Sequence, residues 1–268
     1  MFGFALLTLS ETYEPVLLQR KVNALRKKTN NYTITAARAS NKNPRDLFIS
    51  SITRPIKMLV LSPIILGLSL LTATAYGILY LLFTTLTPMF KSRYGMAKNV
   101  GLVYLGFGLG QFIGIILLSK LSDWLVRKMA KGRDMKPEYR LPPILPGAFA
   151  IPIGLLMYGW TAEYRVHWIA PVIGTVIIGF GMIVVFMPVG VYLIDAFTLY
   201  AASATAANTV LRSLGGAFLP LCGPKLYAAL GIGWGNTLLA GLSLAMIPMI
   251  WYAMKFGEAA RLRSDSKF

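Results

Sequence analysis

Long runs without a charged residue alternate with short cationic segments along most of the chain. One run lies between Lys57 and Lys91, four more are of similar kind, and a further run is interrupted only by Arg212. A bilayer core of about 30 Å is crossed by about 20 helical residues, at a rise of about 1.5 Å each. The pattern therefore predicts six transmembrane helices, at approximately 58–83, 100–119, 141–160, 168–191, 202–222 and 235–254.

The segments outside these helices divide the chain into three parts. Residues 1–57 open with nine mostly apolar residues, too few to cross a bilayer, and continue into a stretch rich in Arg, Lys, Asn and Thr. We interpret them as the end of a helix followed by a basic cytosolic linker. Residues 58–254 form the transmembrane bundle, and residues 255–268 form a cytosolic tail.

The cationic residues indicate the orientation of these helices. The segment before the first helix, the connector at 120–140 and the tail hold 21 of the 27 Lys and Arg residues. Positively charged loops near helix ends tend to stay in the cytosol. We therefore expect both termini on the cytosolic side of a multi-pass protein.

Composition narrows the class of protein. Hydrophobic residues make up 56% of the chain and charged residues 14%, which is typical of a membrane protein whose main partner is the lipid bilayer. The net charge of +17 does not indicate nucleic-acid binding, because the basic residues are not interleaved with stacking aromatics. One His, one Cys and ten dispersed acids offer no catalytic or metal-binding cluster, so we expect no enzyme, metal or cofactor.

Arg212 is the one charged residue within the predicted helix at 202–222. A charge near mid-membrane costs about 2.5 to 3.5 kcal/mol on insertion scales, so the side chain should face the bundle interior or a cavity. Asp195 is the nearest anionic residue in sequence. Two interpretations stay open: a cavity residue that attracts substrate groups, or a structural ion pair between two helices. Helical spacing gives this region one polar, narrow face, formed by Thr205, Asn208, Thr209, Arg212 and Gly216.

Three tyrosines are further candidates for lining a substrate cavity. Tyr76 and Tyr80 are four residues apart in the first predicted helix, so they share a face, and Tyr192 lies in the fourth. Their rings could contact an apolar substrate. No acidic residue lies near the middle of a predicted helix, so proton coupling is not assigned to any residue here.

Glycine and proline positions predict packing and bending. Gly106, Gly110 and Gly114 recur every fourth residue, which is typical of closely packed membrane helices. Pro188 lies close to Gly190 in the fourth predicted helix, and proline within a helix leaves a carbonyl group unbonded. We expect a hinge there.

Several long motifs resemble one transporter family. They are "SETYEPVLLQRKVNALRKKTNN" (10–31), "PEYRLPPILPGAFAIPIGLLMYGWTA" (137–162), "HWIAPVIG" (167–174), "YLIDAFTLYAASATAANTVLRSL" (192–214) and "LGIGWGNTLL" (230–239). They resemble fungal major facilitator superfamily transporters of the drug:proton antiporter type, from the end of the family's sixth helix to its twelfth.

This resemblance implies an all-α polytopic membrane protein with six helices in one bundle of the major facilitator fold. It also implies efflux of small organic compounds, such as drugs or secondary metabolites, in exchange for protons at the plasma membrane. Transport in this fold rocks two bundles about a shared site. A second bundle would come from a partner chain, a homodimer or an upstream segment. The alternative is a truncated remnant that inserts without transporting.

The segment "SKLSDWLVRK" (119–128) resembles the superfamily's cytosolic motif. The resemblance implies that Asp123, Arg127 and Lys128 lock the cytosolic side of the transporter. Ser119 and Trp124 depart from the residues that the family usually has. The other interpretation is a solvated segment with an incidental ion pair worth less than about 1 kcal/mol.

Overall fold

The computed structural model describes residues 14–30, 44–96, 100–130 and 136–265, in which it contains helices and no strand. The chain divides into two units, Met1–Ser50 and Ser51–Phe268. The first unit contains helix α2 (Glu14–Thr29) and the start of α3 (Pro44–Leu61).

The predicted linker within residues 1–57 therefore contains helix, which the sequence analysis did not predict; its role as a linker stays a prediction. Ile52, Ile56 and Val60 of α3 recur every fourth residue and are all exposed, so they form one apolar stripe. A search for uncharged runs misses this periodicity because Arg54 and Lys57 lie among the apolar positions.

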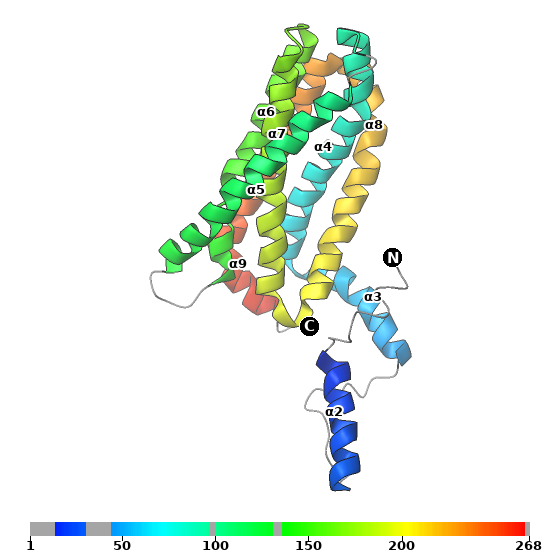
Figure 1. The fold of residues 1–268 in the computed structure, drawn as a ribbon, viewed down its shortest axis with the longest axis vertical. Helices are drawn as coiled ribbons and strands as arrows, with labels where there is room; N and C mark the ends of the chain where they lie inside the picture. Colours follow the sequence, from blue (N-terminus) through cyan, green and yellow to red (C-terminus); the bar gives the residue numbers. More distant parts are fainter. Residues whose placement is uncertain (1–13, 31–43, 97–99, 131–135, 266–268) are drawn as a thin grey trace. The chain divides into compact units, whose positions relative to one another are not determined.

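The second unit is a bundle of long apolar helices (Figure 1). They are α4 (Pro63–Tyr94), α5 (Gly101–Ala130), α6 (Ile144–Glu163), α7 (Ile169–Ala196), α8 (Ala201–Ala245) and α9 (Ile247–Asp265). Short 3₁₀ turns precede α6 and α8, η1 at Pro137–Arg140 and η2 at Thr198–Tyr200.

Five segments of the described chain are long and apolar enough to cross a membrane, and the fifth, Ala201–Arg261, has 61 residues. A straight helix of that length would extend about 90 Å, about three bilayer cores. It reverses at Gly231, whose φ of 77° and ψ of 174° are accessible almost only to glycine. Tyr227 hydrogen-bonds to Asn236 across the reversal. The segment thus corresponds to the last two predicted helices.

Helix ends differ from the predicted bounds for local reasons. The first long helix begins at Pro63, five residues later than predicted, because Ser62 is extended and proline fits the first helical turn. It continues to Tyr94, past Lys91, and ends where Gly95 adopts a left-handed conformation with φ of 66°. Charged residues do not end a helix, whereas a search for uncharged runs stops at them.

The helices approach one another most closely at glycine residues. A Cβ at Gly110 of α5 would overlap the carbonyl oxygen of Val176, so α5 and α7 lie in backbone contact. A Cβ at Gly77 of α4 would lie 2.8 Å from the Gly215 carbonyl oxygen of α8. Such close approaches of glycine-bearing helices are characteristic of membrane bundles.

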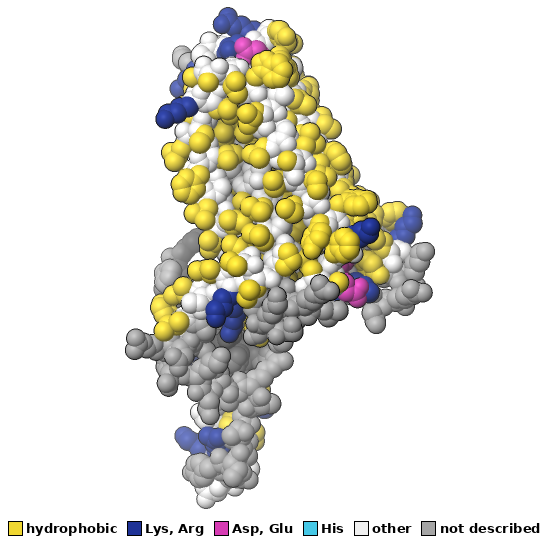
Figure 2. Space-filling model, turned by 180° about the vertical axis from the view of Figure 1, so that it is seen from behind, with side chains coloured by type: hydrophobic (Ala, Val, Ile, Leu, Met, Phe, Trp, Pro, Cys, Tyr) yellow, Lys and Arg dark blue, Asp and Glu magenta, His cyan; other side chains and the backbone are white. Residues whose placement is uncertain are grey.

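We call the end of the bundle that contains η1 the connector end, and the end that contains Gly231 the turn end. Figure 2 shows one face of the bundle covered by hydrophobic side chains over most of its length, with Lys and Arg towards its two ends. This distribution matches the demands of a lipid environment, which excludes charge from its core.

Candidate functional site

Arg212 of α8 lies against an aromatic ring of α4. Its guanidinium carbon is 4.9 Å from the centre of the Tyr76 ring, and its Nε is buried without a hydrogen-bond partner. Among the described residues no carboxylate lies within 4.0 Å of the guanidinium. The contact is a cation–π interaction in place of an ion pair.

Tyr76 is at the centre of an aromatic group that joins α4 to α7. Its ring centre is 4.8 Å from that of Tyr80 and 5.9 Å from that of Phe186 on α7. The Tyr76 and Tyr80 hydroxyls are 3.2 Å apart. Gly216 of α8 makes room for both rings, because a Cβ there would lie 2.8 Å from Tyr76 Cδ1. We call Tyr76, Tyr80, Phe186, Arg212 and Gly216 the arginine–tyrosine site.

Asn208 is buried one helical turn from Arg212. The Thr72 hydroxyl donates to its Oδ1 at 2.6 Å, which joins α4 to α8. The Thr205 and Thr209 hydroxyls donate to backbone carbonyls of their own helix. The predicted polar face of α8 therefore exists, but most of its polar atoms are occupied by neighbours within the protein.

The other two cavity candidates lie at the connector end. The Asp195 carboxylate pairs with Arg140 Nε at 2.6 Å, so it does not form the ion pair with Arg212 that the sequence left open. Tyr192 is fully buried, and a Cβ at Gly257 would lie 3.5 Å from its hydroxyl. Neither residue belongs to the arginine–tyrosine site.

Sequence reasoning missed a set of ion pairs made by η1 and the residue before it. Lys136 pairs with Glu258 at 2.6 Å, and Glu138 lies 3.4 Å from Arg261 Nε. The hydrogen bond from Lys136 to Glu258 raises the pKa of Lys136. The alternating charges of Lys136, Glu138 and Arg140 were the available signal.

The predicted lock lies along the last turns of α5. The side chains of Asp123 and Arg127 lie outside the described residues, so their pairing stays a prediction. Lys128 Nζ lies 4.6 Å from the centre of the Trp124 ring. Ser119 lines a cavity of about 210 Å³ that Arg140 and Pro188 also line.

The predicted packing stripe faces α7. Cβ atoms at Gly106, Gly110 and Gly114 would each meet atoms of that helix. Helix α7 runs without interruption through Pro188 and Gly190 to Ala196, and a Cβ at Gly190 would meet nothing within 4 Å. Their role as a hinge stays a prediction.

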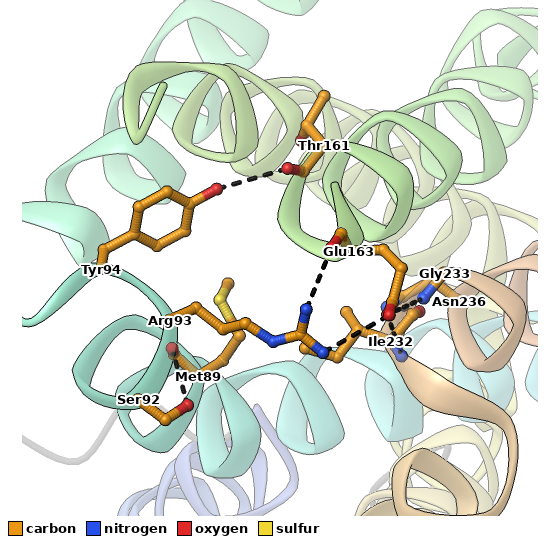
Figure 3. A network of polar contacts seen from close by, with 9 residues as sticks. All are labelled: Met89, Ser92, Arg93, Tyr94, Thr161, Glu163, Ile232, Gly233 and Asn236. Carbon is orange, nitrogen blue, oxygen red and sulfur yellow. Dashed lines mark hydrogen bonds and ion pairs between the residues drawn. The ribbon is translucent and has the colours of Figure 1, made fainter. Parts of the chain in front are cut away.

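The sequence also did not predict a second polar network, which lies at the turn end (Figure 3). Glu163 Oε2 accepts hydrogen bonds from the backbone N–H groups of Ile232 at 2.8 Å and Gly233 at 3.2 Å. Arg93 donates to the Glu163 carbonyl oxygen at 3.0 Å, and Tyr94 donates to the Thr161 carbonyl oxygen. One carboxylate thereby joins the ends of α4 and α6 to the start of the helical segment after Gly231.

Comparisons with known proteins identify the family. The Major Facilitator Superfamily model matches residues 4–220. The MFS-type transporter penM of Penicillium rubens is 51% identical over 98% of this chain and 52% of its own length. The MFS-type transporter atr4 of Stereocaulon alpinum is 49% identical over 96% of this chain and 46% of its own. The chain belongs to the major facilitator superfamily.

This membership makes the chain a multi-pass membrane protein of a transporter family, with the six-helix arrangement of one superfamily half. The efflux pump radE of Floropilus chiversii is 44% identical over 98% of this chain and 49% of its own length. The chain spans about half the length of the curated relatives that it matches. No solved structure matches it.

Proposed function

We propose that this chain is one bundle of a plasma-membrane transporter that exports small organic compounds in exchange for protons. Its similarity to superfamily transporters, one of which is named an efflux pump, supports this function. The cationic connector end faces the cytosol, in agreement with the distribution of Lys and Arg.

The arginine–tyrosine site is the observation that carries this proposal. Arg212 lies within an apolar helix and against the Tyr76 ring, which in turn contacts Tyr80 and Phe186, and an ionised side chain is costly in such surroundings. Intramembrane charges that line a cavity commonly take part in transport. The site forms part of the wall that receives the transported compound.

A second six-helix bundle completes the transporter. Superfamily transport moves two bundles about a site between them, and this chain supplies one. The second bundle comes from another copy of the chain or from a separate segment. Among the described residues, Glu163 and Asp195 stand at helix ends and no carboxylate lies near the middle of a membrane helix, so we place the proton-exchanging carboxyl group in that second bundle.

A split-transporter assay tests the function. The chain is expressed in cells that lack their own export pumps, alone or together with the first half of penM as a separate polypeptide. Export of Nile red, a neutral apolar dye, is followed by the loss of cell fluorescence. We expect export when both halves are present, and its loss when a protonophore removes the proton gradient.

A matched pair of tyrosine variants tests whether the transported compound passes the arginine–tyrosine site. Tyr76→Leu should slow export of the dye several-fold, because it removes the ring at the centre of the site. Tyr252→Leu changes an exposed tyrosine of α9 and should have little effect.

Export by the chain alone, with a dimer in light scattering, would identify a homodimer. Insertion without export in every combination would favour the remnant.

A further inference from the structure

Arg212 has a positive charge that the described part of the protein leaves uncompensated. Its Nε is buried and has no acceptor, and no described carboxylate is within 4.0 Å of the guanidinium. The run from Ala196 to Pro224 contains no other charged residue. An ionised group in an apolar helix is stabilised by a counter-charge or by water.

The polar groups around Arg212 are engaged elsewhere. Asp195 pairs with Arg140, the Asn208 oxygen accepts from Thr72, and the Thr209 hydroxyl donates to its own helix. None of these groups neutralises Arg212, so its stabilisation comes from a counter-charge outside the described residues or from water.

The surroundings of the guanidinium indicate which kind of anionic group can bind to it. The Tyr76 ring lies 4.9 Å from the guanidinium carbon and Nε is buried, so an acceptor approaches the terminal N–H groups. A carboxylate fits these groups with two parallel hydrogen bonds. Tyr80, whose ring centre is 4.8 Å from that of Tyr76, is 41% exposed, which leaves a ring surface against which a flat apolar group can lie.

We propose that the arginine–tyrosine site binds planar organic monoacids, with the acidic oxygen atoms on Arg212 and the conjugated ring against Tyr76 and Tyr80. Aromatic carboxylic acids belong to this class. One guanidinium favours a single negative charge. This inference rests on the proposed transport function and narrows its substrates from organic compounds in general to planar acids.

Binding of two matched probes tests the inference. 2-Naphthoic acid and 2-naphthalenemethanol share one ring system, and only the acid is ionised at neutral pH. Their affinities for the full chain in lipid nanodiscs are measured by isothermal titration calorimetry. We expect the acid to bind about tenfold more tightly than the alcohol, as a charge-assisted bidentate contact predicts.

Variants assign the preference to one side chain. Arg212→Gln should abolish the preference for the acid, whereas Arg212→Lys, which keeps the charge and loses the planar fork, should retain part of it. Lys225→Gln removes an exposed cation from the same helix and should leave the preference unchanged. Circular dichroism and size-exclusion chromatography verify that each variant keeps its helices and remains monodisperse.

Several outcomes would overturn the inference. These are equal affinities for the two probes, binding of neither probe, or a preference for the acid that survives Arg212→Gln. Loss of the preference when the first half of penM is added would assign the counter-charge to the second bundle. Export of Nile red without a preference for the acid would contradict this inference and leave the transport function standing. Binding of the acid without any export would support this inference and contradict the transport function.

Discussion

Single carboxylates at the two ends of the bundle hold segments that are far apart in sequence. Glu163 is the clearest case, because one of its oxygens accepts two backbone N–H groups at the start of a helix and the other faces Arg93. A carboxylate in this position satisfies otherwise unpaired donors and interacts favourably with the helix dipole.

Glu163→Gln should therefore lower the stability of the protein. The substitution removes the charge from the helix cap and from the contact with Arg93, and we expect a loss of about 1 kcal/mol. Unfolding in mixed detergent micelles, followed by circular dichroism, measures the change. Glu258→Gln is the matched control, because it breaks an exposed ion pair with Lys136 and should have a smaller effect. Equal effects of both substitutions would show that the cap contributes nothing specific.

The sequence predicted only some of the side-chain contacts. The pattern identified Arg212 as a cation within an apolar helix and tyrosines of other helices as cavity candidates, and the structure brings Arg212 and Tyr76 together. The sequence did not find the partner of Asp195, because Arg140 is distant in the chain and reaches it only through the fold.

At the scale of elements, glycine determines how closely two helices approach. Helices α5 and α7 touch through Gly110, where an added Cβ would overlap the Val176 carbonyl oxygen. Interiors are too closely packed to absorb an extra methyl group at such a contact, so the helices must separate.

Gly110→Ala should destabilise the bundle by about 1 to 3 kcal/mol, the usual cost of overpacking. Gly108→Ala is the matched control, because a Cβ there meets nothing within 4 Å. This second substitution should be neutral or slightly stabilising, since alanine favours helix. The midpoint of thermal unfolding in detergent distinguishes the two variants. Similar midpoints for both would contradict the close contact between α5 and α7.

Element boundaries were the weaker part of the sequence analysis. Apolar length located the long helices, but their ends depend on Ser62, Gly95 and Gly231, whose backbone conformations break or cap the helix. These are local signals that a search for uncharged runs does not read. The same search did not predict helices α2 and α3, because charged residues lie within them.

At the scale of the whole molecule, the orientation in the membrane remains a prediction. It follows from the cationic connector at 120–140 and the short turn between α6 and α7, which lie at opposite ends of the bundle. The connector should face the cytosol and the turn the outside.

Cysteine labelling checks this orientation. In a Cys222→Ser background, Val166→Cys places a thiol in the exposed turn, and Arg133→Cys places one in the connector. A membrane-impermeant maleimide should label position 166 on intact cells, and position 133 only after permeabilisation. The reverse pattern would invert the orientation and place both termini outside.

The sequence by itself determined that this chain is helical, membrane-embedded and built from segments long enough to cross a bilayer. Those properties depend on the apolar length and charge of each segment, which are local and additive along the chain. The tertiary structure alone decided which side chains meet: Arg212 with Tyr76, Asp195 with Arg140, and Glu163 with the helix after Gly231. Such contacts depend on which helices are neighbours and on their rotation about their axes, and these are set by packing of the whole bundle.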